Sequence, residues 1–126
     1  MEQKLIFDQH TEHLEWLNRL AFYKDDIKIL RNRLTEVAAK NTEHDILANV
    51  EHFENILIVQ QEQNDILRHD VKQYENVIEQ SILKNPTASD HRKMDDHVKL
   101  RDAVSTYEKL FAEMRKDFIS FIAKWM

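Results

Sequence analysis

The chain has 126 residues, about one domain, with no glycine, one proline and no cysteine. The absence of glycine excludes phosphate-binding loops and the sharp turn of an EF-hand, because both need a residue without a Cβ, and it disfavours tight β-hairpins. The absence of cysteine excludes disulfides, iron–sulfur clusters and thiol nucleophiles. The net charge of −5 arises within residues 42–85, which carry 3 basic and 9 acidic groups, and no basic patch for nucleic acid is expected.

The first predicted helix spans residues 3–40. Apolar residues recur along it at heptad-like spacing, in two rows that together form one stripe. Lys40 and Asn41 are expected to end the helix, as a cation in the last turn followed by a residue that tolerates the left-handed conformation. The two rows are Ile6, His13, Leu20, Ile27, Leu34 and Trp16, Tyr23, Leu30, Val37.

The second predicted helix spans residues 43–84 and follows Thr42 as its expected N-cap. Gln60 and Asn64 fall on its apolar stripe, in the least apolar stretch of the helix. Three interpretations stay open: the helix breaks near Asn64, the two amides form a polar core layer that fixes register, or they mark a face where another subunit docks. The apolar members of the stripe are Ile46, Val50, Phe53, Leu57, Leu67, Val71, Tyr74 and Ile78.

Pro86 is expected to end the second helix, and Thr87 or Ser89 can cap a third helix over residues 89–125. The apolar stripe of this third helix begins near His97 and continues to the end of the chain. Its two alternating rows are Val104, Phe111, Phe118, Trp125 and Leu100, Tyr107, Met114, Phe121.

The predicted fold is all-α. Three helices of about 40 residues are rods of roughly 60 Å, and two short connections make sequential neighbours antiparallel. We therefore expect residues 1–126 to form a single up-down-up bundle with coiled-coil-like packing and the general shape of a spectrin repeat. No apolar run approaches the roughly 20 residues of a membrane span, and no secretory signal is visible, so a cytoplasmic protein is expected.

Three of the seven histidines form a candidate metal site. His13 lies in the apolar stripe of the first helix, His97 lies in that of the third, and His10 shares a face with His13. Antiparallel pairing places all three toward one end of the rod, near Glu75, with His97 level with residue 5. Three imidazoles and a carboxylate suit zinc, iron or another divalent first-row metal, so His10, His13, His97 and Glu75 are the candidate ligands.

The alternative interpretation of His13 and His97 is structural. Buried imidazoles are normally hydrogen-bonded, here to neighbouring helices through groups such as Glu75, Asn18 or a tyrosine hydroxyl. The serines lie on helices or at a cap without a nucleophile-elbow motif, so the chain is predicted not to be an enzyme. The remaining histidines, predicted to be solvated, are His44, His52, His69 and His91.

Apolar residues also lie outside the main stripes of the first two helices. Apolar width beyond one seam predicts a further covered surface, formed by a homo-oligomer or by a protein partner. The predicted function is therefore non-enzymatic association, and a metal-binding bundle is the alternative. The additional residues are Leu5, Leu17 and Phe22 in the first helix and Ile56, Val59, Ile66 and Val77 in the second.

The segments WLNRLAFYKDD (16–26) and FISFIAKWM (118–126) resemble the two ends of small uncharacterised helical proteins of Bacteroidetes-type bacteria. His13 and His97 match positions that are often histidine there. Since no activity is established for those proteins, the resemblance implies the fold and keeps the hypothesis of a histidine site open. Of the motifs typical of hemerythrin-like bundles, only the H-x-x-x-x-D pattern occurs, from His97 to Asp102, and the E-x-x-H motif of di-iron bundles is absent.

Overall fold

The computed structural model describes the backbone of residues 2–84 and 90–126 and the side chains of residues 7–80 and 96–126. Pro86, Thr87 and Ser89, which were expected to separate the second and third helices, lie outside the described residues. The side chains of Leu5 and His91 also lie outside them.

The described residues form three long helices and no strand, which confirms the predicted all-α fold. The predicted limits agree with the observed ones to within one residue. The second helix, α2 (His44–Lys84), is continuous through Asn64, so the suggested break at that position is wrong. The helices are α1 (Glu2–Lys40), α2 (His44–Lys84) and α3 (Asp90–Trp125).

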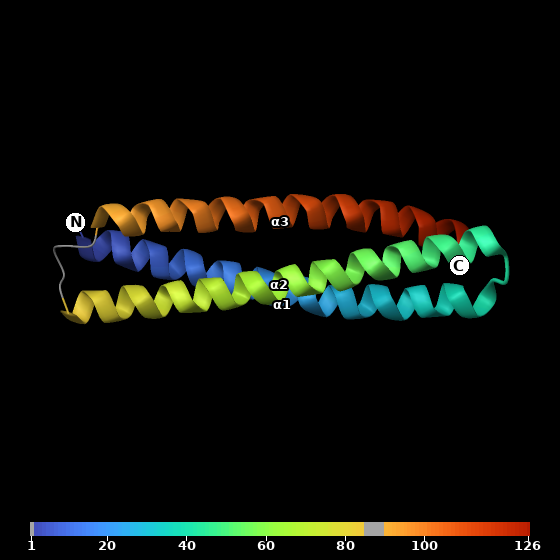
Figure 1. Ribbon diagram of the computed structural model, residues 1–126, viewed down its shortest axis with the longest axis horizontal. Coiled ribbons are helices and arrows are strands. Elements are labelled where there is room, and N and C mark those ends of the chain that lie inside the picture. Colours follow the sequence, from blue (N-terminus) through green and yellow to red (C-terminus); the bar gives the residue numbers. More distant parts are fainter. Residues whose placement is uncertain (1, 85–89) are drawn as a thin grey trace.

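The three helices lie side by side along most of the length of the molecule (Figure 1). α1 and α3 run in the same direction and α2 runs against them, as in an up-down-up bundle. The start of α1 lies near the end of α2 and the start of α3, and the C-terminus lies at the opposite end. α1 packs most extensively against α2 and least against α3. Over the described residues, none of the helices is both long enough and apolar enough to cross a membrane.

The predicted apolar stripes form the core between the helices. Each fully buried aliphatic or aromatic side chain contributes roughly 1.5–3 kcal/mol through removal of apolar surface from water, so these rows dominate the stability of the bundle. The buried apolar residues of the larger cluster are Leu20, Ile27, Leu30, Leu34, Val37, Ile46, Val50, Phe53, Leu57, Leu67, Tyr107, Phe111, Met114 and Phe118, and those of the smaller cluster are Trp16, Val71 and Val104.

A polar layer crosses the middle of this core and confirms the register-fixing interpretation for Asn64, whereas Gln60 takes part only through its backbone carbonyl. Asn64 is fully buried, and its amide nitrogen donates to the Leu20 carbonyl at 2.7 Å and to the Tyr107 hydroxyl at 3.2 Å. The Tyr107 hydroxyl donates in turn to the Gln60 carbonyl at 3.2 Å. The layer joins all three helices, and a shift of any one helix along the bundle would break its hydrogen bonds. The interpretation of Asn64 as part of a docking face is wrong, because its side chain is inaccessible.

The connection between α1 and α2 closes without a left-handed residue. No described residue has a positive φ, so the expected conformation of Asn41 is wrong. Its side-chain amide instead donates to the carbonyls of Val37 at 2.9 Å and Trp125 at 3.1 Å. These hydrogen bonds satisfy carbonyls in the last turns of both α1 and α3. The Glu43 carbonyl accepts the first hydrogen bond of α2, from the Leu47 amide, so Glu43 occupies the N-cap position predicted for Thr42.

Candidate functional site

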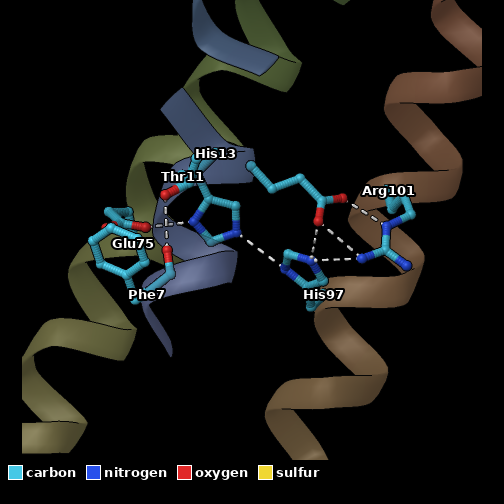
Figure 2. A network of polar contacts seen from close by, with 7 residues as sticks. Phe7, Thr11, His13, Glu75, His97 and Arg101 are labelled. Atoms are coloured by element: carbon cyan, nitrogen blue, oxygen red, sulfur yellow. Dashed lines mark hydrogen bonds and ion pairs between the residues drawn. The ribbon is translucent and has the colours of Figure 1, made fainter. Parts of the chain in front are cut away.

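The structure brings the four candidate ligands together near the N-terminal end of α1. Both oxygens of the Glu75 carboxylate, on α2, are engaged by α1: one accepts a hydrogen bond from His10 Nδ1 and the other accepts one from His13 Nδ1. On the opposite edge of its ring, His13 Nε2 lies 3.1 Å from Nδ1 of His97 on α3 (Figure 2). The buried imidazole of His13 therefore connects α2 to α3.

His13 and His97 are core residues, as their positions on the apolar stripes predicted. Their exposed fractions are 1% and 3%. Trp16 stacks on His97 with ring centroids 5.2 Å apart, and Tyr74 meets His13 edge-on at 5.3 Å. These aromatic rings keep water from the imidazole pair, and burial lowers the pKa of His97 below its ordinary value of 6.5 because it penalises the imidazolium.

The cluster continues to a second ion pair that the sequence interpretation missed. His97 Nε2 lies 3.4 Å from a carboxylate oxygen of Glu12 and 3.3 Å from Nη2 of Arg101. Arg101 also donates to both oxygens of Glu12, at 2.6 and 2.9 Å. The available signal was that Arg101 lies four residues after His97, on the same face of α3.

The axial level of His97 was predicted incorrectly. The sequence placed it level with residue 5, whereas its partners on α1 are Glu12 and His13. The difference is about two helical turns. It arises because the prediction assumed ideal short connections, while side-chain packing sets the offset between α1 and α3.

One set of tautomers gives each ring nitrogen of the two buried imidazoles a hydrogen-bond partner. Because carboxylates only accept, His10 and His13 donate to Glu75 from Nδ1. His13 Nε2 is then an acceptor for Nδ1–H of His97, and Nε2 of His97 accepts from Arg101. Each ring nitrogen of the two buried imidazoles thus has a hydrogen-bond partner, which offsets the cost of burying polar atoms.

The two carboxylates at the ends of this cluster are held in their ionised form. Burial alone would raise the pKa of Glu75, but the hydrogen bonds from His13 and His10 outweigh it and hold that pKa below 4.5. The pKa of Glu12 is lowered chiefly by its hydrogen bond from Arg101. The cluster therefore contains two anions and one cation, with the buried imidazole pair between them.

The arrangement is a linear chain of contacts rather than a ring of ligands. Within the part of the chain that the structure describes, no group of three or more His, Asp or Glu side chains could hold a metal ion. The His13 ring lies between Glu75 and His97, so His97 does not face the carboxylate that His10 and His13 share (Figure 2). Asp102, the acidic residue of the hemerythrin-like pattern, is exposed.

Of the partners expected for structural histidines, Glu75 is found, whereas Asn18 is exposed on the outer face of α1. The predicted surface histidines whose side chains are described, His44, His52 and His69, are exposed.

A groove of about 560 Å³ runs between α1 and α3 beside this cluster. Trp16 and Val104 line it, and two ion pairs lie along it: Arg101 with Glu12, and Arg19 with Glu108 at 2.9 Å. Asp8 and Glu15 also line the groove, so its carboxylates outnumber its two arginines.

The outer face of α1 carries a second apolar row. Its four large side chains, spaced seven or eight residues apart, point away from the core, and the sequence interpretation identified only Phe22 among them. The spacing was visible, but the stronger core stripe on the same helix concealed it. The exposed fractions are 67% for Phe7, 49% for Leu14, 68% for Phe22 and 55% for Ile29.

The predicted additional row on α2 is confirmed in part. Val59, Ile66 and Val77 are about half exposed, whereas Ile56 packs against the core. On α1, Leu17 likewise packs against the smaller core cluster.

Comparison of the chain with protein-family models, curated proteins and solved structures finds no match. The interpretation of these sites therefore depends on their own chemistry.

Proposed function

We propose that this chain is a non-enzymatic helical bundle that acts by binding another helix along the outer face of α1. The observation that carries the proposal is the exposed apolar row Phe7, Leu14, Phe22 and Ile29. Single exposed hydrophobic residues are normal on a protein surface, but four that share one helix face form a seam like those that pair helices.

The size of this row supports binding. With roughly 200 Å² for a phenylalanine and somewhat less for leucine or isoleucine, the exposed fractions correspond to about 450 Å² of apolar surface. The largest apolar patch on a typical monomer covers roughly 300–600 Å² and is often functional. A helix laid along the row would bury all four side chains, because they span about six turns of α1.

The competing row on α2 is weaker. Val59, Ile66 and Val77 are smaller side chains, and they extend over a similar length with one fewer member. Exposed acidic residues, Glu62 and Asp70, lie between them. This row therefore offers less apolar area to a partner, and it provides a matched control for α1.

The proposal is tested by photo-crosslinking in cells of the native host. A benzophenone amino acid placed at Phe22 should yield a covalent adduct with the partner helix, and the same residue placed at Ile66 should not. Both positions are at least half exposed, so neither change should unfold the bundle. Equal labelling from both positions, or none from position 22 in a folded protein, would reject the outer face of α1 as the binding surface.

The second candidate function is binding of zinc or iron by His10, His13, His97 and Glu75. It is favoured by one observation, that His10 and His13 direct Nδ1 toward the same carboxylate. A cation would require that carboxylate to turn aside and His97 to redirect its ring. Metal analysis of untagged protein and thermal melts with and without chelator test it. A stoichiometric metal and a melting temperature lowered by chelator would support the site, and a metal-free protein with unchanged melts would reject it.

A further inference from the structure

We propose that the helix bound by the outer face of α1 is the α1 helix of a second copy of this chain, in antiparallel orientation, with a two-fold axis at Asn18. This inference depends on the proposed function and names its partner. It is carried by the spacing of the exposed row, by the chemistry of the pairs that the spacing creates, and by the apolar area available on each copy.

The exposed row is symmetric about Asn18. Leu14 and Phe22 each lie four residues from Asn18, and Phe7 and Ile29 each lie eleven residues from it. An antiparallel copy rotated about Asn18 therefore brings every large side chain of the row opposite another one. An isologous interface requires such self-complementarity of a single surface, whereas a seam for an unrelated helix does not.

The pairs formed in this way are chemically matched. Phe7 faces Ile29 of the second copy and Leu14 faces Phe22, so each layer combines one aromatic and one aliphatic side chain. Layers that combine a large and a smaller side chain fill space without clashes between two rings.

Charge favours the antiparallel orientation over the parallel one. Asp25 lies on the same exposed face of α1, between Phe22 and Ile29. In a parallel pair it would meet its own copy, and like charges at a seam are destabilising. In the antiparallel pair it meets Thr11, whose side chain is uncharged and exposed.

Asn18 provides the polar element that defines register. Its exposed amide would meet the same amide on the two-fold axis, where each can donate to the oxygen of the other. A single buried asparagine in a helix seam specifies register and orientation at a cost in stability. Displacement by one turn would leave both amides facing apolar side chains.

The area available agrees with a dimer of moderate affinity. Two rows of about 450 Å² bury about 900 Å² of apolar surface, and flanking side chains bring the total to the lower limit of about 1,000 Å² for specific interfaces. The monomer–dimer equilibrium should therefore depend on protein concentration in sedimentation velocity. Asn18→Lys, which places two cations on the axis, should weaken dimerisation at least tenfold, whereas the exposed α2 control Asn55→Lys should leave it unchanged.

Orientation is tested by cysteine crosslinking of the purified full chain, which has no native cysteine. Asn18→Cys should give a covalent dimer with a short bis-maleimide whose span matches the 8–10 Å separation of packed helices. Thr11→Cys and Asp25→Cys should crosslink when mixed, because these positions face each other, but neither should crosslink alone. All three positions are exposed, so the variants should retain the helical signal and melting temperature of the parent chain.

The outcomes separate this inference from the proposed function. Crosslinking of Thr11→Cys with itself would establish a parallel pair and overturn the inference, while leaving the outer face of α1 as a binding surface. A strict monomer at all concentrations, without crosslinks, would also overturn it. The photo-adduct at position 22 would then decide separately, by its mass, whether a different helix occupies the face.

Discussion

Replacement of Glu75 by alanine should destabilise the bundle by about 2–3 kcal/mol. The carboxylate is the acceptor for Nδ1–H of His13, which is fully buried. Leaving a buried donor unpaired costs about 1–3 kcal/mol, and the bond lost is to a charged acceptor, which places the effect in the upper part of that range. The second bond, to His10, adds little, because His10 is 49% exposed and can be hydrated. For a chain of this size the melting temperature should fall by roughly 8–12 °C.

Urea unfolding followed by circular dichroism at pH 7.5 measures this effect, and a double-mutant cycle assigns it. In a His13→Leu background the buried donor is absent, so Glu75→Ala should then cost less than about 1 kcal/mol. Glu79→Ala, an exposed carboxylate on the same helix, should change stability by no more than about 0.5 kcal/mol. An equal cost of Glu75→Ala in both backgrounds, or no cost in the parent chain, would refute the assigned hydrogen bond.

Two further predictions concern buried polar groups. Burial holds the pKa of His97 below 6.5, and hydrogen bonds hold those of Glu75 and Glu12 below 4.5, so the unfolded chain binds protons more readily and stability must fall as pH decreases through these values. In the parent chain, the free energy of unfolding measured with urea should begin to decline below about pH 6.5. His97→Gln should make this decline shallower, whereas the exposed control His69→Gln should not. Identical pH profiles for the two variants would contradict the prediction. Asn64→Leu should raise stability by about 1–2 kcal/mol, because Asn64 Oδ1 is buried with no hydrogen-bond partner among the described residues. A loss of stability in the same measurement would refute this, because the hydrogen bonds of Asn64 would then stabilise the bundle by more than burial of its unpaired oxygen destabilises it.

The sequence was most informative where structure depends on local spacing. The heptad-like rows predicted helix limits to within one residue and identified His13 and His97 as buried. The proximity of Glu75 to the histidines followed from antiparallel pairing at one end of a long rod. Glu12 and Arg101 were not identified, because charged residues are common on the surface of any helix. Their role in the cluster arises only because the tertiary structure places them beside the buried His97.

Helix formation, the choice of buried face and the antiparallel order of the helices were determined by the sequence alone. These properties follow from hydrophobic periodicity and short connections, which act along each helix or between its neighbours. The axial offset of α3 against α1 was decided only by the tertiary structure. Sliding one helix by a turn keeps the same apolar face buried at similar free energy, yet it exchanges every polar partner. The contacts of His97 with His13, Glu12 and Arg101 therefore depend on side-chain packing and on the hydrogen bonds of the Asn64 layer, which select one offset among several that the apolar pattern permits.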